Sequence, residues 1–189
     1  MIHSSRFVAV LDACVLYPAP IRDLLLHLAS LGLYTPKWTE IIHDEWMRNL
    51  LLNRQDLTAE QLRKTKDAMC GAFPDADVVN FEPLIEALEL PDPDDRHLLA
   101  AAIRCQADVI VTANLKDFPA IALASYDVEA QHPDAFISNL IDLNPEKALE
   151  AFRTQVAFLK NPPRTAAQIL DNFRKVEMPV TADKLATLL

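Results

Sequence analysis

The residues most suited to chemistry in this sequence are carboxylates at the ends of expected strands and helices. The run 7–11 is apolar throughout, as in a central parallel strand covered on both faces, and it stops at Asp12. Because open α/β sheets bind ligands at the carboxyl ends of their strands, we expect Asp12 to face a crevice. Further acidic and amide side chains are placed to point at the same crevice. They are Glu45, Asp94, Asp95, Asn114 and Asp117.

Each acid also has a purely structural interpretation. Asp12 could be a turn residue, and Asp94 and Asp95 lie in the first turn of an expected helix, where acids contribute ~0.3–1 kcal/mol by facing free amides. Glu45 is harder to explain in this way. It shares a predicted apolar stripe with Ile41, Ile42, Trp46 and Leu50, where an unpaired carboxylate costs several kcal/mol.

Taken together, the acids indicate a metal site. No lysine or arginine is obviously placed to pair with all of them, and crowded carboxylates raise each other's pKa values. A hard divalent cation removes that conflict. Oxygen-only ligands favour Mg²⁺ or Mn²⁺.

The elements that must position these residues alternate between strand and helix patterns over the first 130 residues. This alternation predicts an α/β fold with a mainly parallel sheet and helices on both faces. We expect a loop at 13–19. The expected strands are 7–12, 33–35, 78–81, 108–112 and 128–130, and the expected helices are 21–31, 40–53, 58–69, 83–88, 98–103 and about 119–124.

From Pro133 onwards the pattern is purely helical. Asn144 followed by Pro145 is typical of a helix N-cap with proline in the first turn, and Thr165 and Thr181 could cap two further helices. We therefore expect two parts, an α/β domain at 1–140 and a helical C-terminal extension at 141–189.

Composition excludes several classes of protein. The 189 residues contain two glycines, too few for a P-loop or a dinucleotide fingerprint, and three widely spaced cysteines, which argue against a zinc site or a disulfide framework. The net charge of -9 argues against a protein that coats nucleic acid, although it is compatible with a metal-dependent nuclease. No apolar run approaches the ~20 residues of a membrane span, and no signal peptide precedes the first strand, so we expect a cytoplasmic protein.

Four segments resemble the PIN domain family in order and spacing. They are Asp12 to Pro18, an acid in the second helix, Asp94-Asp95-Arg96-His97-Leu98, and Val111 to Phe118. The resemblance covers residues 7 to about 137 and is greatest to the longer VapC-type toxins that carry a helical C-terminal extension. It implies a three-layer α/β/α fold, Mg²⁺- or Mn²⁺-dependent endoribonuclease activity, homodimerisation, and a cognate antitoxin that blocks the site.

The resemblance assigns roles to individual residues. Asp12 matches the first metal-binding acid, Glu45 the second and Asp95 the third, with Asp94 as an alternative in the other register. Asn114 stands where the family often has a fourth acid. Asp117 could compensate for the missing charge.

Other residues match the surroundings of the family's site. Thr112 matches a hydroxyl beside the acids, and Cys14 stands where Asn or Ser is more usual. Cleavage would then proceed by in-line attack of an activated water on an RNA phosphodiester. The candidates for contacting the RNA substrate are Thr112, Arg96, Lys116 and Arg22.

Two other functions remain open on the sequence. A receiver-like phosphotransfer domain also places an aspartate at a strand end beside an acidic pair, but that pair belongs near the start of the chain. A non-catalytic module on a PIN fold, binding RNA or protein, is compatible with Asn114, because an amide brings no charge to a metal.

Overall fold

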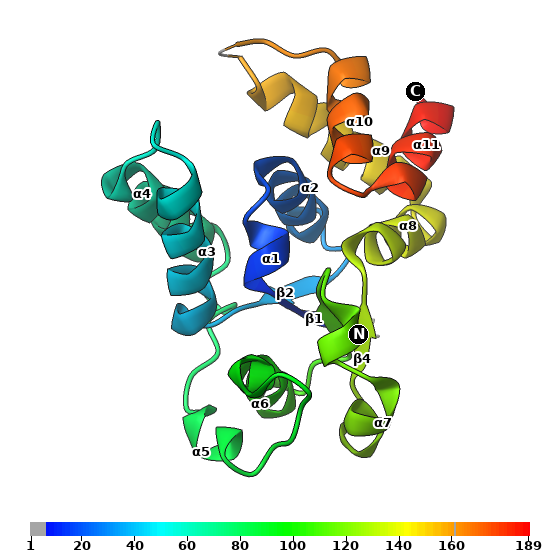
Figure 1. Ribbon diagram of the computed structural model, residues 1–189. Helices are drawn as coiled ribbons and strands as arrows, with labels where there is room; N and C mark the ends of the chain where they lie inside the picture. Colours follow the sequence, from blue (N-terminus) through cyan, green and yellow to red (C-terminus); the bar gives the residue numbers. More distant parts are fainter. Residues whose placement is uncertain (1–6, 161) are drawn as a thin grey trace.

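A computed structural model describes residues 7–160 and 162–189, and its centre is a parallel sheet (Figure 1). In the strand order β2-β1-β3-β4, the chain places β2 on one side of β1 and then β3 and β4 on the other, so the topological switch point lies at β1. β1 pairs with β3 in a register that sets Val10 opposite Ile110. The predicted α/β class with a parallel sheet is confirmed. The strands are β1 (Val8–Leu11), β2 (Thr35–Lys37), β3 (Val109–Val111) and β4 (Glu129–Gln131).

Helices cover both faces of this sheet, as the three-layer expectation requires. In Figure 1 the helices α1, α2 and α8 lie above the sheet and α6 and α7 lie below it, while α3 and α4 stand beside the β2 edge. Their bounds are α1 (Ala13–Leu16), α2 (Ala19–Ser30), α3 (Glu40–Asn53), α4 (Ala59–Ala72), α5 (Glu82–Ile85), α6 (Arg96–Cys105), α7 (Ala120–Leu123) and α8 (Pro133–Leu143).

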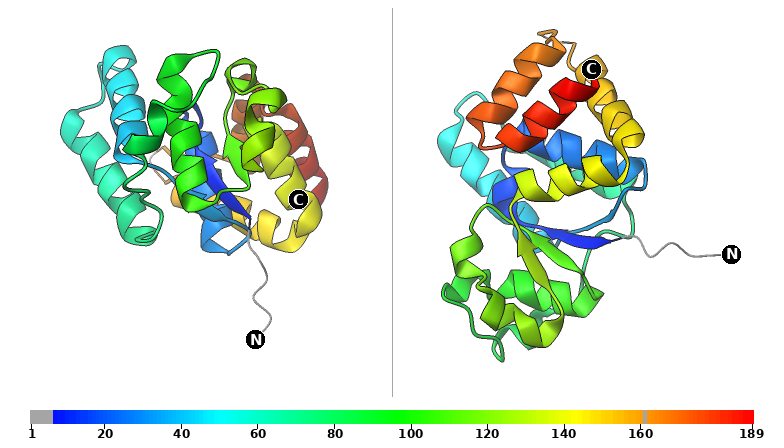
Figure 2. Two further views of the ribbon diagram at one scale, coloured as in Figure 1. Left: turned by 90° about the horizontal axis from the view of Figure 1, so that it is seen from below. Right: turned by 90° about the vertical axis from the view of Figure 1, so that its right-hand side faces the viewer.

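The C-terminal helices pack on α2 and α8 and share their core. In α9 (Pro145–Phe158), the Gln155 Nε2 donates to the Pro20 carbonyl at 2.9 Å, and Lys147 Nζ donates to the Leu31 carbonyl at 3.0 Å. Phe152 and Phe173, from α9 and α10 (Ala166–Lys175), are completely buried against each other. With α11 (Pro179–Leu188), these helices form a second layer above the sheet (Figure 2).

Helix caps explain most element boundaries. Thr58 forms the expected capping box with Gln61, Thr165 caps α10, and Asn144 accepts from the Lys147 amide with Pro145 in the first turn. Thr39 accepts from the Ile42 amide and starts α3 at the predicted residue.

Three expectations about local structure were wrong. The segment 13–19 is not a plain loop, because Asp12 caps the short helix α1. The segment 78–81 is not a strand, since Asn80 has a positive φ of 60° and only an isolated bridge between Trp38 and Asp77 forms there. Thr181 does not cap a helix, because it lies inside α11.

Helix α6 carries the acidic turn to the sheet. Its residues Ala100, Ala101 and Ala102 are completely buried, and their small side chains let the helix approach the strands closely. The short 3-10 helix η1 (Pro93–Asp95) directly precedes α6, so its acids are held at the same end of the sheet as Asp12.

Within the described ranges, no helix has both the length and the apolar character that crossing a membrane requires.

Candidate metal centre

The carboxylate of Asp12 is fixed by three donors at the carboxyl end of β1. Its Oδ2 accepts from the Thr112 hydroxyl at 2.7 Å and from the Cys14 thiol at 3.0 Å, and its Oδ1 faces the Cys14 amide at 3.4 Å. Desolvation of the thiol, together with the Asp12 charge, raises the pKa of Cys14 to about 12, so the thiol keeps its proton and donates it. Asp12 is therefore positioned while one oxygen stays largely free.

A chain of hydrogen bonds leads from Asp12 to Asp117. The Thr112 hydroxyl accepts from the Asn114 amide at 3.0 Å, and the Asn114 side-chain amide donates to the Asp117 carboxylate. Asp117 lies in η2 (Leu115–Asp117), the turn that follows β3. Because β1 and β3 are neighbours, their carboxyl ends bring Asp12 and Asp117 to one side of the sheet.

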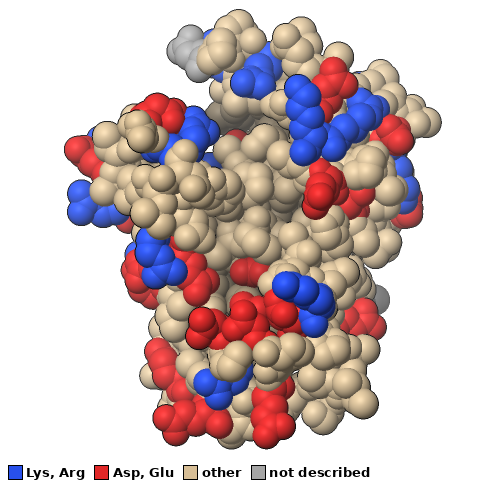
Figure 3. Space-filling model, in the orientation of Figure 1, with Lys and Arg blue, Asp and Glu red and all other residues tan. Residues whose placement is uncertain are grey.

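The closest group of acids contains Asp92, Asp95 and Asp117, each with a carboxylate oxygen within 4.8 Å of the others. Asp95 Oδ2 is buried and has no hydrogen-bond partner among the described residues. Burial first, and then the charges of Asp12, Asp92 and Asp117, raise the pKa of Asp95 to about 6. Figure 3 shows the acidic side chains gathered in a band across the middle of this face.

Glu45 lies beside a different partner. Its Oε1 is 3.3 Å from His97 Nε2, in the first turn of α6, and His97 is almost fully buried. The Glu45 side chain is only partly buried, and Ile41, which the predicted apolar stripe of α3 includes, is exposed. The buried face of α3 is therefore narrower than predicted. His97 thus links the second predicted acid to the helix that begins directly after Asp95.

The four candidates for substrate contacts differ in how free they are. Lys116 is exposed beside the acids, and Arg96 donates to the Pro93 carbonyl at 2.9 Å. Thr112 is 0% exposed and holds Asp12. Arg22 is largely buried, with its guanidinium donating to the Leu16 carbonyl and lying over Trp46. Lys116 and Arg96 are therefore accessible to a substrate, whereas Thr112 and Arg22 make contacts inside the protein.

The donor set fits a hard divalent cation. It consists of carboxylate oxygens, and one of them, Asp95 Oδ2, is buried without a partner in residues 7–160 and 162–189, which costs ~1–3 kcal/mol or more for a charged group. A cation bound among Asp92, Asp95 and Asp117, near the charge of Asp12, would satisfy that oxygen and relieve the repulsion that raises the Asp95 pKa.

Sequence reasoning missed Asp92 and left the choice between Asp94 and Asp95 open. Asp92 caps η1 by accepting from the Asp94 backbone amide at 2.9 Å, and Asp94 is exposed and outside the close group of acids. The Asp-Pro step at 92–93 is itself a cap signal, and it could have indicated that Asp92 belongs to the turn beside Asp95.

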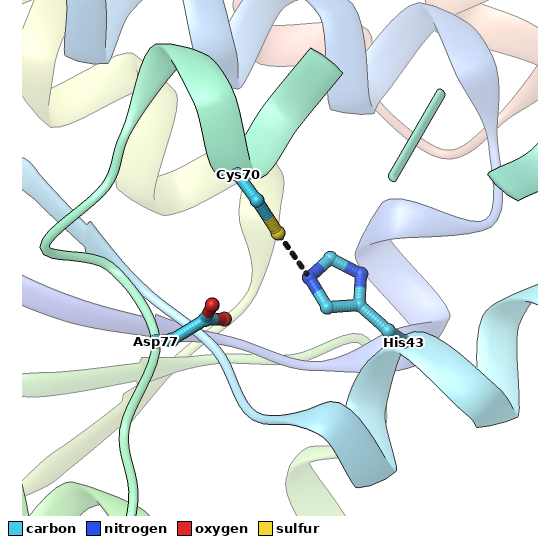
Figure 4. Close-up of side chains that lie close together, drawn as sticks. All are labelled: His43, Cys70 and Asp77. Atoms are coloured by element: carbon cyan, nitrogen blue, oxygen red, sulfur yellow. Dashed lines mark hydrogen bonds between the residues drawn. The ribbon is translucent and has the colours of Figure 1, made fainter. Parts of the chain in front are cut away.

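A second cluster, formed by His43, Cys70 and Asp77, lies between α3 and α4 (Figure 4). The Cys70 thiol is 3.8 Å from His43 Nε2, and the Trp46 indole N–H donates to His43 Nδ1 at 3.0 Å. That bond uses the lone pair on Nδ1, so the neutral ring carries its proton on Nε2. The nitrogen facing Cys70 then has no lone pair for a cation, which favours a structural role for this cluster.

Comparison with known proteins gives the class to which this fold and site belong. The model described as PIN domain matches residues 8–116, which is more than half of the chain. The chain therefore belongs to the PIN domain family, and the resemblance seen in its acidic motifs is confirmed.

The C-terminal helices identify the branch of the family. The model described as VapC50 C-terminal domain matches residues 133–187. A Mycobacterium tuberculosis (strain ATCC 25618 / H37Rv) protein named "Putative ribonuclease VapC50" is 46% identical over 77 residues, which are 41% of this chain and 46% of that protein. The match thus spans less than half of that relative's length. No solved structure matches the chain significantly.

Proposed function

We propose that this chain is a divalent-metal-dependent endoribonuclease and the toxin of a toxin–antitoxin pair. The observation that carries the proposal is the buried Asp95 oxygen, which has no hydrogen-bond partner in the described part of the chain and lies near three other carboxylates at the switch point of the sheet. Its support from relatives is the PIN domain match and the similarity to a protein named as a ribonuclease.

The roles of the residues follow from their contacts. Asp92, Asp95 and Asp117 would hold Mg²⁺ or Mn²⁺, with Asp12, whose charge acts on Asp95, as a further ligand. Glu45 pairs with His97 in the first turn of α6. A cation bound there would lower the pKa of a water molecule and offset charge at the scissile phosphate. Thr112 and Cys14 keep Asp12 in place for that task.

Two cations of the protein are available to the substrate. Lys116 is exposed one residue from Asp117, and Arg96 is one residue from Asp95. Both can contact the phosphates that flank the scissile bond. Such contacts offset part of the repulsion between RNA and a chain with a net charge of -9.

The test is cleavage of mixed RNA by the purified protein with Mg²⁺, Mn²⁺ or EDTA. We expect Asp12→Asn and Asp95→Asn to abolish cleavage, and the exposed neighbour change Asp94→Asn to leave most of it. Equal cleavage by the wild type and Asp12→Asn would identify a contaminating nuclease. RNA binding without any cleavage would instead favour the non-catalytic module, and a stable phosphate on Asp12 after incubation with a phosphodonor would favour the receiver-like alternative.

The partners proposed here are RNA as the substrate, a cognate antitoxin and a second copy of the chain. Co-expression with the product of an adjacent small gene should restore growth to cells that this chain arrests. Light scattering of the purified protein tests the homodimer. A chain that does not slow growth and remains monomeric would contradict both assignments.

A further inference from the structure

A hollow of about 480 Å³ lies between the β4 edge of the sheet and α8, away from the acidic centre. Its floor is apolar and buried, and two exposed apolar side chains, Phe7 and Leu143, stand at its margin. Phe7, Asp108 and Asp127 come just before β1, β3 and β4, so most of the hollow lies at the amino ends of the strands. The floor is formed by Val109, Phe136 and Leu140.

The strand beside this hollow has one free edge. The Glu129 amide donates to the Asp108 carbonyl and the Thr112 amide donates to the Gln131 carbonyl, both at 3.0 Å. Since residues 129 and 131 face β3, the N–H and C=O of Ala130 point outward. In the part of the chain that the structure describes, neither group has a hydrogen-bond partner. In the right-hand view of Figure 2, no other strand among the described residues lies alongside this edge of β4.

The rim of the hollow is acidic. Asp108, Asp127 and Glu129 all border it, and none of the residues that line it is a lysine or an arginine. Asp108 Oδ2 accepts from the Val8 amide at 2.7 Å, so this carboxylate also holds the start of β1. Asp127 and Glu129 are exposed and have no cationic partner among the described residues.

We propose that this hollow binds an extended, basic segment of a partner protein, which adds to β4 as a further strand. The Ala130 N–H and C=O pair with the backbone of the segment. Its apolar side chains enter the hollow above Val109 and Leu140, and its lysine or arginine side chains meet Asp127 and Glu129.

The negative charge of the rim favours binding of a basic segment over binding of a second copy of the chain. Two copies related by a two-fold axis at this edge would bring their acidic rims together, and like charges close to each other destabilise a contact. The proposed segment meets no such repulsion. Because most of the hollow lies at the amino ends of the strands and none of the acids near Asp95 lines it, this inference does not depend on the proposed function.

The experiment uses the full chain and a synthetic peptide that alternates lysine with leucine. We expect peptide binding to shift the backbone amide resonances of residues 128–132 and of α8, and to slow hydrogen exchange at Ala130. The double change Asp127→Asn with Glu129→Gln should weaken binding roughly three- to tenfold. Asparagine suits position 127, where φ is 54°, so this variant keeps its fold.

Three controls separate this proposal from general attraction to an acidic protein. Glu86→Gln with Glu89→Gln removes two exposed charges elsewhere and should leave the affinity unchanged. A peptide N-methylated at alternate residues cannot pair with a strand and should bind at least tenfold more weakly. Equal weakening by both double variants, resonance shifts confined to the acidic centre, or self-association that the Asp127→Asn and Glu129→Gln changes abolish would overturn the proposal.

Discussion

At the scale of single residues, the acidic centre depends on the hydroxyl that holds Asp12. Thr112 is buried, donates to Asp12 and accepts from the Asn114 amide. We expect Thr112→Val to lower the free energy of unfolding by about 1–3 kcal/mol, because the buried Asp12 carboxylate loses its hydroxyl donor and the Asn114 amide loses its acceptor. Mn²⁺ affinity should fall by roughly tenfold or more, as when outer-shell partners of metal ligands are removed. Urea denaturation and calorimetric Mn²⁺ titration measure the two effects.

Thr112→Ser is the matched control for this change. It keeps the hydroxyl and loses only a methyl group, so its Mn²⁺ affinity should stay close to that of the wild type. If Thr112→Val and Thr112→Ser bind Mn²⁺ equally well, the hydroxyl does not position Asp12 for the cation.

The crowding of the acids predicts a pH dependence in the metal-free protein. The folded-state pKa of Asp95 is about 6, above the unfolded value of ~3.9, so the folded chain binds this proton more tightly. The resulting stabilisation is present below about pH 4 and is lost as the pH rises toward 6. In EDTA, Asp95→Asn should therefore gain stability relative to the wild type over that window, as measured by urea denaturation at a series of pH values.

The adjacent change Asp94→Asn tests whether this effect is local. Asp94 is exposed and outside the carboxylate group, so this variant should follow the wild-type profile. Parallel profiles for the wild type and Asp95→Asn would contradict the repulsion inferred from the geometry.

At the scale of elements, the helix starts that depend on nearby residues were predicted correctly from the sequence. Thr39, Thr58 and Asn144 cap helices as expected, because an N-cap depends on residues only three positions apart. The run 78–81 was misread as a strand because Val78 and Phe81 are apolar and buried, yet the intervening Asn80 takes a positive φ. A short run of apolar residues in the sequence is expected both for a strand and for an irregular segment whose side chains pack into the core.

The acidic centre was predictable in part, because two of its acids follow directly from the strand pattern. Asp12 and Asp117 follow apolar strands, so the parallel sheet alone brings them to one end. Asp92 was missed because its place depends on the 3-10 turn η1 folding back beside η2, a tertiary contact that no local pattern encodes.

The start of α11 shows a cap supplied by a different element. Asp134 in α8 is 7% exposed, and its carboxylate accepts from the Val180 amide at 3.0 Å and from the Thr181 amide at 2.7 Å. We expect Asp134→Ala to cost about 1–3 kcal/mol, because two amides at a helix N-terminus lose their acceptor. Hydrogen exchange of residues 179–188 should speed up more than that of α9.

Asp142→Ala is the comparison for that prediction. Asp142 is also in α8 but forms an exposed ion pair with Lys184, which should contribute less than ~1 kcal/mol. A loss of stability as large for Asp142→Ala as for Asp134→Ala would show that the buried cap contributes no more to stability than an exposed ion pair.

At the scale of the whole molecule, the C-terminal helices belong to the same hydrophobic core as the sheet. The buried side chains of Ile169, Phe173 and Leu185 join the cluster that contains Leu24 and Leu28 of α2. The expected division at residue 140 also falls inside α8, which the VapC50 C-terminal domain match includes from residue 133. The division itself stays a prediction, but any such extension shares its core with the PIN domain.

A shared core predicts that the whole chain unfolds in one step. Both tryptophans, Trp38 and Trp46, lie in the PIN domain, whereas far-UV circular dichroism also reports α9, α10 and α11. Because removal of the C-terminal helices would expose α2, the urea transitions followed by fluorescence and by circular dichroism should coincide in midpoint and slope. A circular dichroism transition that precedes the fluorescence change would mean that the extension unfolds on its own, and that its packing against α2 contributes little to the stability of the domain.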